Sequence, residues 1–176
     1  MPVYFNEPLS MLQRGSEVME YKDIIRKANN CSDERLRLGY IISAFTLVFS
    51  TSIGRVKKPF NPLKGETFEY IDDDFRLVVE QTSHHPPIHC FYGECDDFIY
   101  KGFFDIKLIF GLKGFSIKPI GKKIVFLKKT KETFELQLPP YSIHNIVIGS
   151  TYVWYNGKII ANNVTNKMRA ELEFTP

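Results

Sequence analysis

Most of the chain consists of short segments rich in β-branched and aromatic residues, separated by turn residues. In one segment Phe134, Leu136 and Leu138 alternate with polar residues, which is typical of a strand with one buried face. The spacing of the segments predicts a meander of antiparallel strands, and Asn156-Gly157 between two of them predicts a two-residue hairpin. The predicted strands cover residues 76–81, 88–94, 99–110, 115–118, 124–127, 133–138, 143–148, 151–155, 158–162 and 168–174.

The chain before these segments favours helices. Residues 8–30 place apolar side chains among many charges, as an amphipathic helix does. A second helix is expected after Ser32, which can cap its free amides, with Asp33 and Glu34 in the first turn, where the helix dipole favours negative charge. Because residues 36–49 are apolar nearly all round, this helix should be buried on several sides. Helices followed by an antiparallel meander define an α+β fold.

Length and composition favour one domain that spans residues 1–176, with a helical segment over 1–55 and a sheet over 56–176. The three cysteines show no CxxC spacing, so we expect free thiols and a reducing cytosol. No apolar run approaches the roughly 20 residues that a membrane span needs. We therefore expect a cytoplasmic protein that associates with membranes only peripherally.

The sequence EQTSHHPP at residues 80–87 concentrates polar chemistry in a short stretch. Proline lacks an N–H group and biases the preceding residue toward extended geometry, so His85 and Pro86 should leave the regular ladder and hold the imidazoles in a preset direction. Two stiffly held imidazoles can bind a phosphate, bind a metal, or act as acid and base. The simplest structural alternative is a proline turn that the imidazoles cap through hydrogen bonds.

A zinc site is the sharper chemical alternative, because Glu80, His84, His85 and His89 are all residue types that ligate metals. Neighbouring side chains of an extended chain point to opposite faces, however, so two adjacent histidines converge on one ion only if the backbone bends. We therefore expect no metal and no cofactor. Phosphate binding is geometrically easier, since each imidazole can donate to a different oxygen.

A second unusual run, KKPFNPLKGE, lies upstream at residues 57–66. Together the two runs closely resemble the oxysterol-binding protein family, whose ligand-binding domain carries a KPxNPxxGE element followed by an EQxSHHPP signature. Further resemblance lies in FNEPLSMLQR at residues 5–14 and in IHNIVIG at residues 143–149. The resemblance thus extends over nearly the whole chain.

The resemblance implies an incomplete antiparallel β-barrel around a lipid tunnel, with an amino-terminal lid and carboxy-terminal helices. The pattern of strands is compatible with a barrel but does not establish closure. This chain begins just after the position of the lid and ends before the later strands and the basic carboxy-terminal helix of the family. We therefore expect the lid and part of the phosphoinositide site to be missing.

The resemblance also implies a headgroup site in which Lys58, His84 and His85 contact the phosphate of phosphatidylinositol 4-phosphate. A lysine is a flexible point charge suited to a phosphate, although a solvated surface lysine is the ordinary alternative for Lys58. The residues expected to support the loop are Asn61, Gly65 and Glu66. The residues expected to face either lipid or the core are Phe60 and Leu63.

Residues 106–131 contain eight lysines and no acidic residue. Lysines on the solvent faces of edge strands discourage edge-to-edge pairing, and a patch that faces an anionic membrane is the functional alternative. Nucleic acid is not expected as a partner, because no RNA-binding signature accompanies the lysines. Enzyme chemistry is not expected either: the chain has no nucleophile elbow, P-loop or dinucleotide fingerprint, and no catalytic residue is assigned.

The resemblance implies a protein that binds and transfers lipid, exchanging sterol and phosphatidylinositol 4-phosphate between membranes. The alternative is a module of the same fold that binds a phosphoinositide or a protein without transferring lipid. The expected partners are a lipid ligand, either sterol or phospholipid, and a transient membrane surface. Self-association is also expected, because an unpaired sheet edge and an apolar helix would remain exposed.

Overall fold

A computed structural model of the chain describes residues 3, 6–111, 114–145 and 149–175. The helical elements are α1 (Met11–Ser16), a 3-10 helix η2 (Glu17–Tyr21), α2 (Lys22–Asn30), α3 (Glu34–Leu47) and a 3-10 helix η3 (Val48–Ser52). The first seven strands are β1 (Asn6–Ser10), β2 (Lys58–Phe60), β3 (Thr67–Ile71), β4 (Arg76–His84), β5 (Pro87–Glu94), β6 (Phe98–Phe104) and β7 (Ile106–Gly111). The remaining strands are β8 (Gly114–Pro119), β9 (Lys123–Leu127), β10 (Glu132–Gln137), β11 (Tyr141–His144), β12 (Tyr152–Tyr155), β13 (Gly157–Asn163) and β14 (Met168–Phe174).

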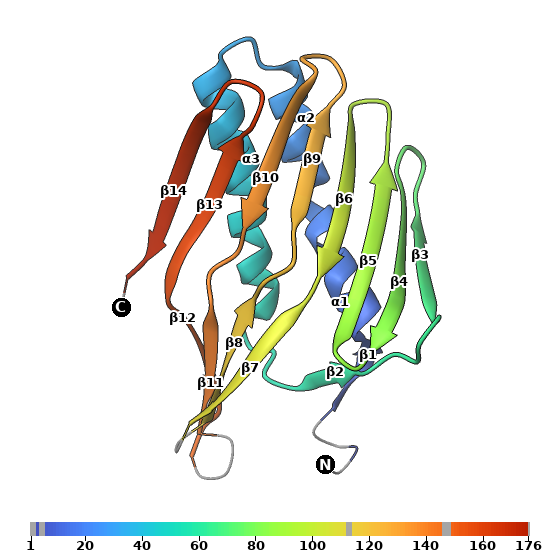
Figure 1. Ribbon diagram of the computed structural model, residues 1–176, viewed down its shortest axis with the longest axis vertical. Helices are drawn as coiled ribbons and strands as arrows, with labels where there is room; N and C mark the ends of the chain where they lie inside the picture. Colours follow the sequence, from blue (N-terminus) through green and yellow to red (C-terminus); the bar gives the residue numbers. More distant parts are fainter. Residues whose placement is uncertain (1–2, 4–5, 112–113, 146–148, 176) are drawn as a thin grey trace.

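The strands form an antiparallel meander, as the spacing of the segments predicts. An eight-stranded sheet has the order β14-β13-β10-β9-β6-β5-β4-β3, and a four-stranded sheet has the order β12-β11-β8-β7. The chain passes between the two sheets at four places, β6 to β7, β8 to β9, β10 to β11 and β12 to β13. At these crossings the neighbours within a sheet are not consecutive in the sequence: β6 pairs with β9, β8 with β11 and β10 with β13. Because β3 and β14 are the edges of the larger sheet, the described strands form an incomplete barrel (Figure 1).

Two predictions about the strands are wrong for one reason, which is that strands leave one sheet and enter the other. The predicted strand over residues 99–110 is divided at Asp105 into β6 and β7. Asn156-Gly157 makes no hairpin, because β12 pairs with β11 in the small sheet while β13 pairs with β10 and β14 in the large one. Gly157 has φ of 105° where the chain crosses between the sheets. Of the predicted strand over 143–148, residues 146–148 lie outside the described residues.

Close backbone packing marks the boundary between the two sheets. A Cβ atom on Gly121 would lie 2.2 Å from the carbonyl oxygen of Phe103, and one on Gly102 would lie 2.0 Å from that of Lys122. At the same boundary the Phe103 amide donates to the Lys122 carbonyl at 2.9 Å. Only glycine permits the strands to approach this closely, so these two positions allow the sheet to bend.

The amino-terminal segment is less helical than predicted. Residues Asn6–Ser10 form strand β1, which pairs in parallel with β2. Helix α1 begins at Met11, because the Ser10 hydroxyl accepts from the Gln13 amide at 3.3 Å and the Gln13 side chain accepts from the Ser10 amide at 2.9 Å. This reciprocal capping box fixes where the chain leaves β1 and enters α1.

Helix α3 differs from its prediction at its start and on one face. Its N-cap is Asp33 rather than Ser32, because the Asp33 carboxylate accepts from the Arg35 amide at 2.8 Å and the Leu36 amide at 3.0 Å. One side of the helix is buried, but Leu36 is 58% exposed, so the helix is not covered all round. Figure 1 shows α1, α2 and α3 on one face of the large sheet, where α3 contacts β13 and β14.

A buried ion pair fastens α3 to the sheet. The Arg37 guanidinium donates to both carboxylate oxygens of Glu132 on β10, at 2.9 and 2.6 Å, and the side chains are only 9% and 5% exposed. Asn163 and Asn166 also donate to this carboxylate. Burial raises the pKa of Glu132, but the hydrogen bonds from Arg37 and Asn166 more than offset that effect and hold the pKa below its ordinary value.

We predict that Glu132→Gln destabilises the fold by about 3–5 kcal/mol, because it leaves the Arg37 cation buried without its counter-ion. Urea denaturation at neutral pH measures this loss. The matched control is Glu171→Gln on β14, where the carboxylate bonds to exposed Lys158 and Arg169 and should matter little. Equal stability of the two variants would show that the buried pair does not anchor α3.

Candidate ligand-binding site

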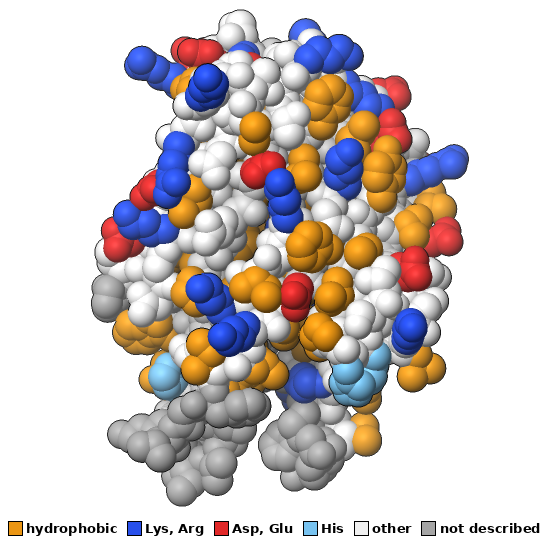
Figure 2. All heavy atoms as spheres, viewed as in Figure 1, with side chains coloured by type: hydrophobic (Ala, Val, Ile, Leu, Met, Phe, Trp, Pro, Cys, Tyr) orange, Lys and Arg blue, Asp and Glu red, His pale blue; other side chains and the backbone are white. Residues whose placement is uncertain are grey.

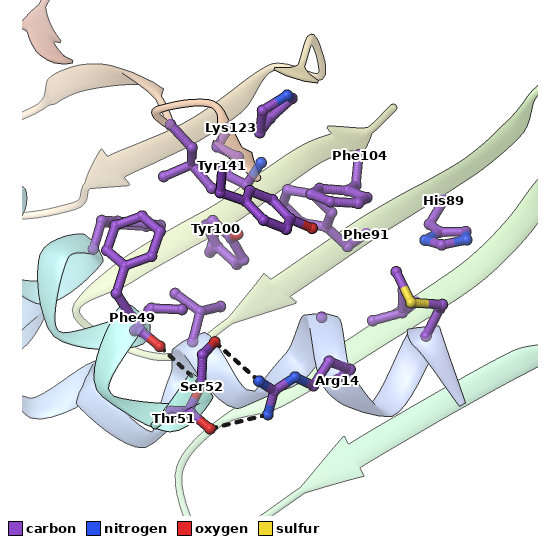
Figure 3. Close-up of a pocket in the computed structure, with 18 of the residues that line it drawn as sticks. Arg14, Phe49, Thr51, Ser52, His89, Phe91, Tyr100, Phe104, Lys123 and Tyr141 are labelled. Atoms are coloured by element: carbon purple, nitrogen blue, oxygen red, sulfur yellow. Dashed lines mark hydrogen bonds between the residues drawn. The ribbon is translucent and has the colours of Figure 1, made fainter. Parts of the chain in front are cut away.

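A cavity of about 180 Å³ lies between the helices and the inner face of the sheet. Its walls come from α1, from the junction of α3 and η3, and from strands of both sheets, and most of its side chains are aliphatic or aromatic (Figure 3). The lining residues are Met11, Arg14, Gly15, Val18, Phe45, Val48, Phe49, Thr51, Ser52, Leu77, Val79, His89, Phe91, Tyr100, Phe104, Pro119, Lys123, Leu138, Pro139, Tyr141 and Tyr155.

Arg14 is the charged group of the helical wall, and its charge is compensated. Its guanidinium donates to the Glu17 carboxylate at 2.7 Å, to the Thr51 carbonyl at 3.2 Å and to the Ser52 hydroxyl at 3.0 Å. Figure 3 shows the bonds to Thr51 and Ser52 beneath the cavity. Arg14 therefore ties α1 to η3 and has few donors left for a ligand.

Lys123 is the charged group of the sheet wall, and it is only 6% exposed. Its ammonium lies 4.8 Å from the centre of the Phe104 ring, a cation–π contact, and within the described part of the chain no carboxylate forms an ion pair with it. Burial lowers the pKa of Lys123 to about 8. The prediction that lysines of this region cover solvent faces is thus wrong for Lys123.

Two more polar side chains point inward from β4 and β5. His89 is 6% exposed, stacks on the Phe104 ring at 6.0 Å, and its Nε2 has no hydrogen-bond partner among the described residues. Burial lowers the pKa of His89. Gln81, which faces His89 across the two strands, is fully buried with neither side-chain polar atom bonded within the described structure. Of the two, only His89 lines the cavity, and an orphaned polar atom there is expected where a ligand or water completes its bonding.

The predicted histidine site forms the turn between β4 and β5. His84 ends β4 and pairs with Pro87 at the start of β5, so His85-Pro86, which is a cis peptide, makes a two-residue turn. The centres of the two imidazole rings lie 4.7 Å apart, and the rings meet edge to face with an angle of 70° between their planes. The turn therefore brings together rings that a straight strand would direct to opposite faces.

The upstream loop is fastened to the same strand. Gly65 has φ of 82°, in the left-handed region, and its amide donates to the Gln81 carbonyl at 2.8 Å. The Gln81 amide donates back to the Glu66 carbonyl at 3.0 Å, and the Glu66 carboxylate accepts from the Leu63 amide at 2.8 Å. These bonds anchor the loop to Gln81 of β4, which lies three residues before His84.

Lys58 begins β2, whose register with β1 pairs it with Asn6. Its ammonium donates to the Asn61 side-chain oxygen at 2.7 Å, and desolvation by neighbouring atoms lowers its pKa although the residue is exposed. Figure 1 shows β2 at the end of the molecule where the β4–β5 hairpin turns. In Figure 2 histidine side chains occupy the edge of the molecule over that hairpin. We call Lys58, His84 and His85 together the basic rim.

Other predicted residues lie elsewhere. Phe60 is 43% exposed and Leu63 is 73% exposed, and neither lines the cavity. His89 points into the cavity, away from the turn that holds His84 and His85, and no group of three metal-ligating side chains occurs among the described residues. Nor does the described part of the chain contain a helix long and apolar enough to cross a membrane.

The sequence reasoning missed the polar groups of the cavity. Lys123 shares one face of β9 with Val125 and Leu127, which are both fully buried. The sequence does not show which face is inside, because Ile124 and Phe126 on the other face of β9 are apolar as well. The surrounding lysines also obscure the position of Lys123, because a lysine among lysines is normally assigned to solvent.

A bent antiparallel sheet that holds helices on its inner face and leaves an apolar cavity between them is the architecture of a small-ligand binding domain. The sequence profile described as Oxysterol-binding protein matches residues 1–176. The chain is 38% identical over 180 residues to human oxysterol-binding protein-related protein 1, covering 100% of this chain and 19% of that protein. This chain belongs to the oxysterol-binding protein family.

Other proteins of this family resemble the chain in sequence and in fold. Oxysterol-binding protein-related protein 3C of Arabidopsis thaliana is 34% identical over 177 residues, which cover 100% of this chain and 38% of that protein. The crystal structure of the Osh1 ORD domain in complex with cholesterol matches with a TM-score of 0.88 and 34% identity, over 93% of this chain and 40% of that one. The crystal structure of the Osh3 ORD from Saccharomyces cerevisiae in complex with PI(4)P matches with a TM-score of 0.87 and 30% identity, over 100% of this chain and 48% of that one. The chain thus spans less than half the length of these relatives.

We predict that stability depends on pH through Lys123. Its pKa is about 8 in the folded protein against an ordinary value of 10.5, so between these values the unfolded chain binds more protons and stability rises with pH. The difference in unfolding free energy between Lys123→Met and wild type, measured in urea, should therefore be largest below pH 8 and shrink toward pH 10.5. A difference independent of pH would contradict the burial of a charged Lys123.

Proposed function

We propose that this chain binds a lipid in the cavity and a phosphate-bearing headgroup at the basic rim, and that it contributes to exchange of sterol and phosphatidylinositol 4-phosphate between membranes. The observation that carries the proposal is the position of an apolar cavity between α1 and the sheet, with a rigid, basic rim on strands that α1 also contacts. No covalent step is required, because extraction and release are both binding equilibria.

The cavity supplies the free energy for extraction. Burying a lipid tail gains about 0.8 kcal/mol for each CH₂ group removed from water, so an apolar cavity can compete with a bilayer. Aromatic rings line it on several sides; Phe91, for example, stacks on Tyr100 at 4.5 Å. The Osh1 relative binds cholesterol in its crystal structure, which supports a rigid apolar ligand for this chain as well.

The rim supplies selectivity for a headgroup. His84 and His85 present adjacent rings at a fixed turn, and Lys58 stands on a strand held by β1. Imidazole and ammonium groups donate charge-assisted hydrogen bonds to phosphate oxygens, which are stronger than neutral ones. The Nδ1 of His84 is buried and has no hydrogen-bond partner among the described residues, so the ring is not already committed to a protein acceptor at that atom. The Osh3 relative binds PI(4)P in its crystal structure.

The headgroup site has a direct test in vesicle binding. We predict that His84→Ala/His85→Ala weakens binding to vesicles containing phosphatidylinositol 4-phosphate by about tenfold or more relative to wild type, because two charge-assisted bonds are lost. Sedimentation with matched neutral vesicles measures the preference. The control is His144→Ala, since His144 stacks on Tyr152 at the end of β11, away from this turn. Unchanged preference in the double variant would remove the headgroup site.

The cavity can be closed without disturbing the core. Gly15 lines it, and a Cβ atom there would meet nothing within 4 Å, so Gly15→Trp should fold and fill the opening. We predict that this variant loses most binding of a fluorescent sterol, measured by fluorescence transfer. The matched control is Gly39→Trp on α3, where a Cβ atom also meets nothing within 4 Å but which lies outside the cavity. Full sterol binding by Gly15→Trp would place the ligand elsewhere.

A module that binds a headgroup without transferring lipid remains the second candidate, and the favourable observation for it is that the rim is separate from the cavity lining. Neither Lys58 nor the histidine pair is among the residues around the cavity. Under this alternative, Gly15→Trp would leave binding to phosphoinositide vesicles unchanged and wild type would bind no sterol. Measuring sterol binding and vesicle binding for both wild type and Gly15→Trp therefore distinguishes lipid transfer from headgroup binding alone.

A further inference from the structure

The cavity has an uncompensated positive charge. Arg14 and Lys123 both line it, whereas none of the described lining residues is acidic. Arg14 is neutralised from behind by Glu17. Lys123 has only the face of the Phe104 ring, and no described carboxylate comes within 4.0 Å of its ammonium. The net charge that a ligand meets inside the cavity is therefore that of Lys123.

An unpaired buried ammonium is costly to the empty protein. Removing a charge from water without a counter-ion is strongly unfavourable, and the cation–π contact recovers only part of that cost. Nothing in the packing requires a cation here, since the neighbouring inward positions of β9 are Val125 and Leu127. The Lys123 ammonium therefore lacks a counter-ion among the described residues and could gain one from a bound ligand.

The groups around Lys123 indicate the kind of partner. The ammonium lies beside the Tyr141 and Phe104 rings, and His89 stacks on the other side of Phe104 with an unbonded Nε2 (Figure 3). These neighbours are aromatic or basic, so they favour an apolar body that carries oxygen acceptors. A carboxylate satisfies both the charge and the bonding of Lys123, whereas a hydroxyl satisfies only the bonding.

We propose that the cavity takes an acidic amphiphile, a lipid whose carboxylate enters the cavity and pairs with Lys123. This proposal rests on the proposed function, because it requires that the cavity hold a lipid, and it adds which chemical class of lipid is preferred. It concerns the inner wall of the cavity and not the rim formed by the histidine turn and Lys58.

The test compares two probes with the same hydrocarbon chain, one carrying a carboxylate and the other a neutral methyl ester. The probes are cis-parinaric acid and its methyl ester, whose fluorescence rises in an apolar cavity. Wild type should bind the acid about tenfold more tightly than the ester, the value expected for one charge-assisted bond inside a protein. Lys123→Met, which replaces the cation by an apolar chain of similar length, should bind both probes equally. Lys101→Met, an exposed lysine on β6, is the control and should keep the preference.

A second readout separates pairing from a change of shape. The preference for the acid should fall between about pH 7 and about pH 9.5, where Lys123 loses its proton while the probe stays ionised. The other titratable groups that face the cavity are Arg14 from α1, His89 from β5, Tyr100 from β6, Tyr141 from β11 and Tyr155 from β12. Burial raises the pKa of Tyr100 and of Tyr141, the latter to about 12, so these two stay neutral in this range.

Each outcome is decisive. An acid preference that disappears in Lys123→Met and weakens at high pH supports the proposal. Equal binding of acid and ester by wild type overturns it while leaving lipid binding by the cavity intact. Binding of neither probe also overturns this inference, and the fluorescent-sterol measurement then decides separately whether the cavity holds a lipid. Because Lys123→Met removes an unpaired charge, its thermal unfolding temperature should match or exceed that of wild type, which establishes that the variant is folded.

Discussion

The arrangement of the molecule depends on how α3 is held against the sheet. The Arg37–Glu132 pair joins the first turns of α3 to β10, and two asparagines add bonds to Glu132, Asn163 from the end of β13 and Asn166 from the turn that follows it. With one end of α3 fixed in this way, its other end, at Phe45, lies over the cavity. A buried ion pair contributes little net stability against apolar packing, but it specifies one orientation, because any other leaves two charges buried apart. That orientation decides which part of the inner face is packed and which part stays open.

The rim and the cavity are connected through β4. Its residue Gln81 exchanges backbone bonds with Gly65 and Glu66 on one side, while its neighbours Leu77 and Val79 line the cavity on the other. The loop that carries Asn61, the partner of the Lys58 ammonium, and the turn that carries the histidines are thus supported by one strand. The rim is therefore supported by backbone bonds that do not involve the side chains of the cavity.

Much of the fold follows from sequence periodicity. Alternation in β10 correctly predicts that Phe134 and Leu136 are buried, and the regular spacing of segments predicts the meander. What the sequence does not show is where a strand passes from one sheet into the other. Those points depend on close approach of distant backbones, as at Gly121 with Phe103, and local sequence looks the same whether Gly157 makes a hairpin or a crossing.

The sequence predicts the local parts of the site but not the parts that distant segments assemble. The histidine turn and the lysine strand are visible because prolines and paired histidines are rare and local, and the structure forms a turn at that place. The cavity is assembled from α1, the α3–η3 junction and strands of both sheets, so no short stretch reveals it. Lys123 in particular is assigned to solvent by its type and by its lysine neighbours, and only the tertiary fold shows that its side of β9 faces inward.

The proposed lipid cargo requires that one lipid molecule occupy the cavity of this chain. Native mass spectrometry of the protein re-isolated from vesicles containing sterol and phosphatidylinositol 4-phosphate measures this occupancy. We expect a mass increase equal to one lipid per protein molecule, with tandem dissociation releasing that lipid intact. A protein that sediments with the vesicles yet returns with its unaltered mass would contradict occupancy of the cavity and would leave a membrane-binding module without a lipid cargo.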